Sequence, residues 1–162
     1  MRDSAPLPEL AVRSHARLLE ASGDDPWVRY AVPHHLSGAA WELEGALLIE
    51  RRHRWMPRRH ALVSLGRPDS VESLLRQAVV AGVPQWLGVC SLSVPDHLSE
   101  VAARAVALDN GAHWSWLWTT APPALHPLEA QVVDLDDRRD AEQIAALSAE
   151  HSRPLRAPST PG

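Results

Sequence analysis

Residues 51–60 gather arginine side chains around one aromatic ring, a composition that could bind phosphate. Guanidinium groups neutralise phosphates, and the indole of Trp55 could stack on an unpaired base. The alternative, which we favour, is an exposed, charged connection between two strands that keeps a sheet edge from pairing with other chains. With 16 basic and 20 acidic residues the net charge is −4, so such a patch would bind nucleic acid weakly, and we expect no nucleic-acid partner. The five arginines of this possible anionic-ligand patch are Arg51, Arg52, Arg54, Arg58 and Arg59.

Three tryptophans alternate with other residues in residues 113–119. Successive side chains of a strand point to opposite faces, so Trp114, Trp116 and Trp118 would form a stripe about 13 Å long. Such a stripe could stack on a ligand, but we favour a place in a core or an interface with a domain or partner. If another domain packs there, the stripe would be exposed and adhesive in the isolated chain.

Nine histidines raise the question of a metal site, and the closest groupings are His34 with His35 and His53 with His60. Neighbours on a strand point to opposite faces, and no acidic or cysteine ligand stands at a recognised spacing, so we predict no metal site. Cys90 lies in an apolar run, where a thiol is usually protonated and inert. No Gly-x-Ser-x-Gly motif marks a nucleophilic serine. The residue patterns predict no catalytic, cofactor-binding or metal-binding residue.

Composition indicates a folded protein without a membrane segment. Of its 162 residues, 45% are hydrophobic and 22% are charged, which is typical of globular chains. The single cysteine excludes an internal disulfide. No apolar run follows the N-terminal methionine, and none approaches the roughly 18 residues of a membrane span. We therefore expect a soluble, cytoplasmic protein with no membrane partner.

The elements that must position these residues begin with two helices, predicted over residues 8–21 and 26–32. Two short apolar runs, 46–49 and 61–65, predict strands that form a hairpin around the arginine cluster. The apolar positions of residues 68–81 repeat with helical spacing, which makes this the clearest helix of the chain.

The alternation of strand and helix continues in the second half of the chain. Residues 86–92 predict a strand buried on both faces, and residues 95–105 predict a helix. The tryptophan-rich residues 113–119 follow as the next predicted strand. This order predicts an α/β protein.

A boundary is predicted after the tryptophan strand. Three prolines within residues 121–127 predict a linker, because proline cannot donate to a central strand ladder. Beyond it we expect a strand at residues 131–135 and a helix whose start resembles a capping box, with Asp137 and Asp140 three residues apart. The polar, proline-rich end from residue 151 onward predicts disorder.

Two segments carry a resemblance to a known family. Residues 132–147, Val-Val-Asp-Leu-Asp-Asp-Arg-Arg-Asp-Ala-Glu-Gln-Ile-Ala-Ala-Leu, resemble the first strand and first helix of a GNAT acetyltransferase domain. Residues 114–129, which begin Trp-Ser-Trp-Leu-Trp-Thr-Thr and include Pro122 and Pro123, are similar to the junction of two-part bacterial GNAT proteins. In those proteins a divergent N-terminal domain precedes the catalytic domain.

The resemblance implies an α/β fold with a GNAT-like mixed sheet and flanking helices, followed by an isolated strand–helix unit and a disordered tail. The family binds the pyrophosphate of acetyl-CoA on backbone N–H groups of a Gln/Arg-x-x-Gly-x-Gly/Ala loop at a helix N-terminus. No pair of glycines here has that spacing, and even the nearest pair, Gly82 and Gly88, belongs to a helix end and a strand. The implied division is a divergent GNAT-like domain at 1–120, a Pro-rich linker at 121–130, the first strand and helix of a truncated catalytic domain at 131–151, and a tail at 152–162.

Two functions are compatible with these expectations. The first is the non-catalytic N-terminal region of an acetyl-CoA-dependent N-acetyltransferase, which packs on a catalytic half supplied in cis or in trans and helps to shape the acceptor-amine site. Acetyl-CoA is then the cofactor of the complete protein, and this chain alone binds none and transfers no acetyl group. The second is a stand-alone module that binds a protein or a nucleic acid through the tryptophan stripe or the arginine loop.

Overall fold

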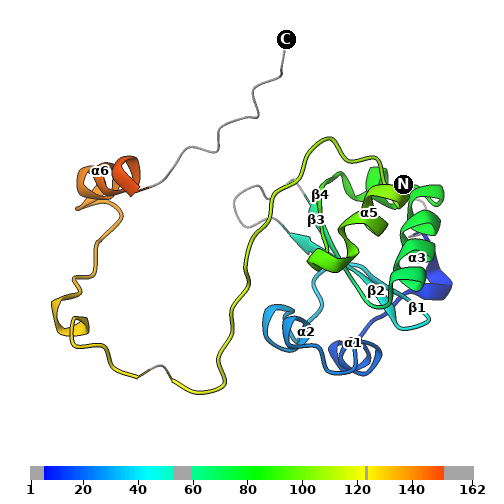
Figure 1. The fold of residues 1–162 in the computed structure, drawn as a ribbon, viewed down its shortest axis with the longest axis horizontal. Coiled ribbons are helices and arrows are strands. Elements are labelled where there is room, and N and C mark those ends of the chain that lie inside the picture. The colour runs from blue at the N-terminus through cyan, green and yellow to red at the C-terminus, as the bar shows by residue number, and fades with distance from the viewer. Residues whose placement is uncertain (1–5, 53–59, 123, 152–162) are drawn as a thin grey trace, which may run out of the picture. The chain divides into compact units, whose positions relative to one another are not determined.

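The computed structural model describes residues 6–52, 60–122 and 124–151, and the chain divides into two compact units (Figure 1). The first unit, Met1–Trp118, contains a four-stranded sheet with helices on both faces, and this mixed sheet confirms the predicted α/β class. The second, Thr119–Gly162, contains a 3-10 helix and one α-helix in its described part. None of the helices in the described ranges is both long enough and apolar enough to cross a bilayer.

The sheet has the strand order β1 (Ala40–Leu43), β2 (Ala46–Arg52), β3 (His60–Leu65) and β4 (Val89–Ser93). The first three strands pair antiparallel, whereas β4 lies parallel to β3. The antiparallel β2–β3 pair confirms the predicted hairpin, and β1 is an additional strand that the sequence pattern did not indicate. It reaches β2 through a two-residue turn, Glu44 and Gly45, whose φ values of 49° and 78° suit the twist of a hairpin.

One face of the sheet is covered by α3 (Pro68–Val80) and α5 (Ser99–Ala105), which pack on Trp41, Leu48 and Leu62 (Figure 1). The predicted helix is confirmed, and its predicted apolar stripe is buried except at Val79, which is exposed. Its buried apolar residues are Val71, Leu74, Leu75 and Ala78.

The other face is covered by α1 (His15–Ala21) and α2 (Pro26–Ala31), whose Leu18 and Val28 have no exposed surface (Figure 1). Because side chains alternate along each strand, the residues between those of the first face supply this second core. The strand residues of the second core are Ala40, Leu47, Ile49, Val63 and Leu65.

Two predicted elements of the first unit are wrong in part. The single helix over residues 8–21 is a 3-10 helix, Pro8–Leu10, followed by α1, because the chain between them pairs with β1. There the amide of Val12 donates to the carbonyl of Ala40 at 2.8 Å. A backbone committed to a strand edge cannot also form the i to i−4 bonds of a helix.

The predicted strand at residues 86–92 is also wrong in its bounds. A short helix, α4 (Val83–Leu87), occupies its first half, and Gly88, with a φ of 68°, ends that helix before β4 begins. β4 is an edge strand on which Cys90 and Ser91 are exposed, so the prediction of a strand buried on both faces is wrong as well.

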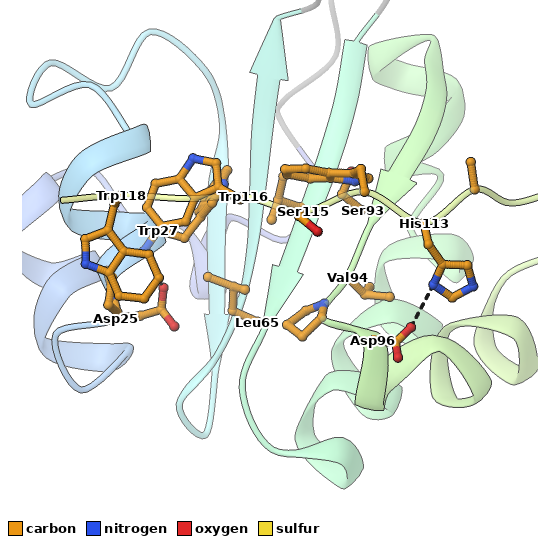
Figure 2. Close-up of a pocket in the computed structure, with 15 residues that line it drawn as sticks. Asp25, Trp27, Leu65, Ser93, Val94, Asp96, His113, Ser115, Trp116 and Trp118 are labelled. Carbon is orange, nitrogen blue, oxygen red and sulfur yellow. Dashed lines mark hydrogen bonds and ion pairs between the residues drawn. The ribbon is translucent and has the colours of Figure 1, made fainter. Parts of the chain in front are cut away.

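The tryptophan-rich residues 113–119 form no strand. Figure 2 shows the extended segment from His113 to Trp118 crossing the strands of the sheet instead of lying alongside one of them. A chain that crosses a sheet cannot pair its N–H and C=O groups with a neighbouring strand. The alternation of tryptophans therefore reflects contact with one face of the sheet, not membership of it.

The second unit differs from its prediction at the expected strand. Residues 131–135 form no strand, since a 3-10 helix, Glu129–Gln131, is followed by an unpaired extended chain. The predicted helix is present as α6 (Ala141–His151), and the carboxylate of Asp136 accepts from the amides of Arg138 and Arg139 just before it, at 3.0 and 2.8 Å. The carboxylate that binds these amides is thus one residue earlier than the predicted Asp137, and it caps the turn before α6. The tail expected at 152–162 lies outside the described residues.

Candidate functional site

The tryptophan segment encloses a groove of about 610 Å³ on the second face of the sheet (Figure 2). Its floor is formed by β3 and by the start of the loop after β4, through Leu65, Val94 and Pro95. Trp27 of α2 forms one end, and all three tryptophans of the predicted stripe line the groove. We call this feature the tryptophan groove.

Trp27 is held in place by the start of α2. Pro26 occupies the first helical turn, where its missing N–H costs no hydrogen bond. Asp25 caps the helix, and its Oδ1 accepts from the amides of Trp27 and Val28 at 2.7 and 3.4 Å. The Trp27 side chain is only 9% exposed, so it lies largely in the second core, and its small exposed part lines the groove.

Trp116 and Trp118 stack on each other, with ring centroids 5.2 Å apart and an angle of 20° between their planes. Trp116 is half-buried against the second core and anchors the segment. Trp118 and Trp114 remain 52% and 58% exposed, which is unusual for side chains that gain so much from burial. The structure thus divides the stripe between one anchoring residue and two that offer surface to a ligand or partner.

The far end of the groove carries an exposed ion pair, in which His113 Nδ1 lies 2.9 Å from Asp96 Oδ1 (Figure 2). Asp25 is the other carboxylate in the lining, and no arginine is among the lining residues of the described chain. The groove is therefore aromatic and apolar along its length, with an acidic side chain at each end.

Only part of the predicted arginine patch belongs to the described residues. Arg51 and Arg52 end strand β2, and Arg51 is exposed and does not line the tryptophan groove. Arg54, Arg58 and Arg59 lie outside the described residues. Within the described chain, the structure does not bring the two predicted surfaces together.

The described histidine and cysteine side chains contact other residues of the fold. Buried His15 has its Nε2 3.0 Å from the carbonyl of Val28, and its ring meets the edge of His34 at 4.7 Å. The described residues contain no group of three or more His, Cys, Asp or Glu side chains arranged to hold a metal ion. Cys90 is exposed, and its thiol donates to the carbonyl of His60 at 3.4 Å, so the expectation of a thiol enclosed in an apolar strand is wrong.

The passage from β3 to α3 is where a β–α–β unit commonly binds phosphate. Only Gly66 and Arg67 connect the two elements, and a Cβ at Gly66 would lie 2.7 Å from the Cα of Ala46. Gly66 therefore permits close packing of the backbone on the β1–β2 turn. The helix then begins with Pro68, which has no N–H, and Asp69, which is negatively charged. This helix end presents neither a glycine-rich loop nor a free run of N–H donors to a pyrophosphate.

Sequence reasoning missed Trp27, Asp25 and Asp96 as groove residues. The Asp-Pro pair at residues 25–26 carries only the signal of a helix start, and nothing in the spacing links it to residues 113–118.

Comparison of the chain with protein-family models, with curated proteins and with solved structures finds no match.

Proposed function

We propose that the first unit is a non-catalytic, GNAT-like domain that works beside an acetyl-CoA-binding domain supplied in cis or in trans. The resemblance at residues 114–129 and 132–147 suggests the family, and a mixed sheet with helices on both faces is compatible with it. The observation that carries the non-catalytic role is the β3–α3 connection. It is too short for a pyrophosphate loop and is followed by a proline and a carboxylate.

The second unit supports the need for a further domain. Val132 and Val133 are 72% and 74% exposed, and no side chain in the described part of this unit is fully buried. An apolar extended chain next to a helix gains stability only when it adds to a sheet or core. We infer that these residues pack against the catalytic part of the complete assembly.

Calorimetric titration of acetyl-CoA into the chain tests the first half of the proposal. We expect no heat of binding, because the β3–α3 connection has neither a glycine-rich loop nor a free first turn to hold the pyrophosphate. Saturable binding at micromolar acetyl-CoA with one site per chain would contradict it.

A second test is the DNA beyond codon 162 and the neighbouring genes, where we expect a Gln/Arg-x-x-Gly-x-Gly/Ala loop to be encoded. Its absence from both would remove the basis for a catalytic partner.

A second candidate function is binding through the tryptophan groove by a chain that acts alone. Half-exposed Trp114 and Trp118 favour it, since aromatic surface of this size is a common anchor of interfaces and ligand sites. Ligand binding by the isolated chain distinguishes this role from the first, which requires a separate catalytic domain before any activity is seen.

A further inference from the structure

We propose that the tryptophan groove binds an organic cation, a quaternary or substituted ammonium group, at its Trp27–Trp118 end, with Asp25 as the counter-ion. Figure 2 shows Trp27, Trp116, Trp118 and Asp25 together at this end of the groove. The proposal rests on the groove alone and does not depend on an acetyltransferase role.

The first argument is the aromatic surface. Cations are attracted to the negatively charged faces of indole rings, and tryptophan is the strongest partner of this kind. Stacking on Trp116 occupies one face of Trp118, yet the Trp118 side chain remains 52% exposed and can contact a ligand. Trp116 is fixed by the second core, so the stacked pair is preorganised and little conformational entropy is lost on binding.

The second argument is the charge of Asp25. Its Oδ1 accepts both capping bonds, and its Oδ2 accepts no hydrogen bond within the described chain. The nearest guanidinium in sequence, that of Arg29, is paired with Asp24 instead. Asp25 therefore presents an unneutralised carboxylate to an aromatic groove, where an ammonium group would be attracted and an anion repelled.

The third argument is the size and chemistry of the groove. A volume of about 610 Å³ lies in the range of about 300–1,000 Å³ that is usual for small-molecule sites. The floor between Leu65 and Pro95 is apolar, which suits methyl or methylene groups around a charged nitrogen better than a strongly hydrated ion. A trimethylammonium group combines that apolar surface with a single positive charge.

Choline and its neutral isostere 3,3-dimethylbutan-1-ol test the proposal on the full chain. Binding is followed by calorimetry and by the NMR signals of the indole N–H groups. We expect choline to shift the signals of Trp27, Trp116 and Trp118, and the neutral isostere to bind about tenfold more weakly. Trp86, which is 39% exposed on α4 and outside the groove, serves as the internal control and should not shift.

Two variants separate charge from shape. Asp25→Asn keeps a helix-capping side chain, so α2 should persist while the affinity for choline falls about three- to tenfold. The affinity for the neutral isostere should not change. Asp69→Asn removes an exposed carboxylate that does not line the groove and should leave both affinities unchanged.

Four results would overturn the proposal. Three of them are equal affinity for choline and the neutral isostere, an unchanged choline affinity in Asp25→Asn, and no shift of the groove indoles at millimolar choline. Trp118→Leu, a substitution of a half-exposed side chain that should fold, must also weaken choline binding about threefold or more. Unaltered binding in that variant would place the ligand elsewhere.

Discussion

At the scale of single residues, the backbone conformation and close surroundings of Gly66 leave no room for a side chain. Its φ of 127° is rarely adopted by other residues, and an added Cβ would meet the Cα of Ala46 at 2.7 Å. We expect Gly66→Ala to lower the free energy of unfolding by about 2–4 kcal/mol, measured by urea denaturation. Gly88→Ala is the matched control, because Gly88 also has a positive φ, 68°, but its Cβ would meet nothing within 4 Å. Equal losses in both variants would show that φ alone, and not close packing, explains Gly66.

The stacked tryptophans should differ in their contribution to stability. Trp116 packs against the second core, whereas Trp118 is 52% exposed. Trp116→Leu should therefore lower the free energy of unfolding by about 1–2 kcal/mol, while Trp118→Leu should change it by less than about 0.5 kcal/mol. Chemical denaturation followed by circular dichroism measures both values. The reverse order would mean that the segment is anchored through Trp118.

At the scale of elements, Glu72 joins the two helices on the first face of the sheet. Its carboxylate accepts from Arg76 of its own helix α3 at 2.7 Å and from Arg104 of α5 at 2.9 Å. The hydrogen bonds from Arg76, and then those from Arg104, lower the pKa of Glu72 below its ordinary value of 4.5. A lowered pKa in the folded chain means that the ion pairs stabilise the fold above the ordinary pKa and are lost as the pH falls through the folded value.

Glu72→Gln tests this coupling. We expect the variant to unfold at a lower urea concentration than the parent at pH 7, and the difference to disappear as the pH falls through the lowered pKa of Glu72. Glu100→Gln, an exposed substitution on α5 with no ion pair among the described residues, is the control and should follow the parent at every pH. A difference that persists at low pH would show that the carboxylate acts through packing and not through its charge.

The elements that could be predicted from the sequence are those whose stability is local. Helix α3 combines an apolar stripe with a proline at its start, and β2 and β3 are short apolar runs, so each was found. The elements that were missed depend on distant contacts. Residues 113–119 alternate like a strand but cross the sheet, and β1 owes its pairing to a turn that requires positive φ at Glu44.

The groove could be predicted only in part for the same reason. The alternation of Trp114, Trp116 and Trp118 correctly indicated side chains that share a side, and all three line the groove. Trp27 and Asp25 are almost ninety residues away in sequence and carry only the signal of a helix start. A single sequence contains no information on which strand a crossing segment covers, so the carboxylate beside the indoles could not be inferred.

At the scale of the whole molecule, the two units differ in how their backbone is protected. In the first unit, β2 is paired on both sides and lies between two buried cores. In the described part of the second unit, backbone–backbone hydrogen bonds occur only in the 3-10 helix Glu129–Gln131, in α6 and in the turns beside them, and almost all side chains are exposed. Local opening of exposed, unpacked helices costs far less free energy than opening of a buried strand.

Hydrogen exchange measured on the full chain by mass spectrometry should therefore separate the units. We expect amides of β2, β3 and α3 to exchange only on global unfolding, and those of residues 119–151 to exchange within seconds at neutral pH. Adding a catalytic domain that packs on the second unit should slow exchange in α6 and in residues 132–135, whereas adding choline should slow only the groove segments around Trp27 and around Trp116 and Trp118. Strong protection of residues 119–151 in the chain alone would contradict the expectation for the second unit, because it would mean that this unit already has a core of its own.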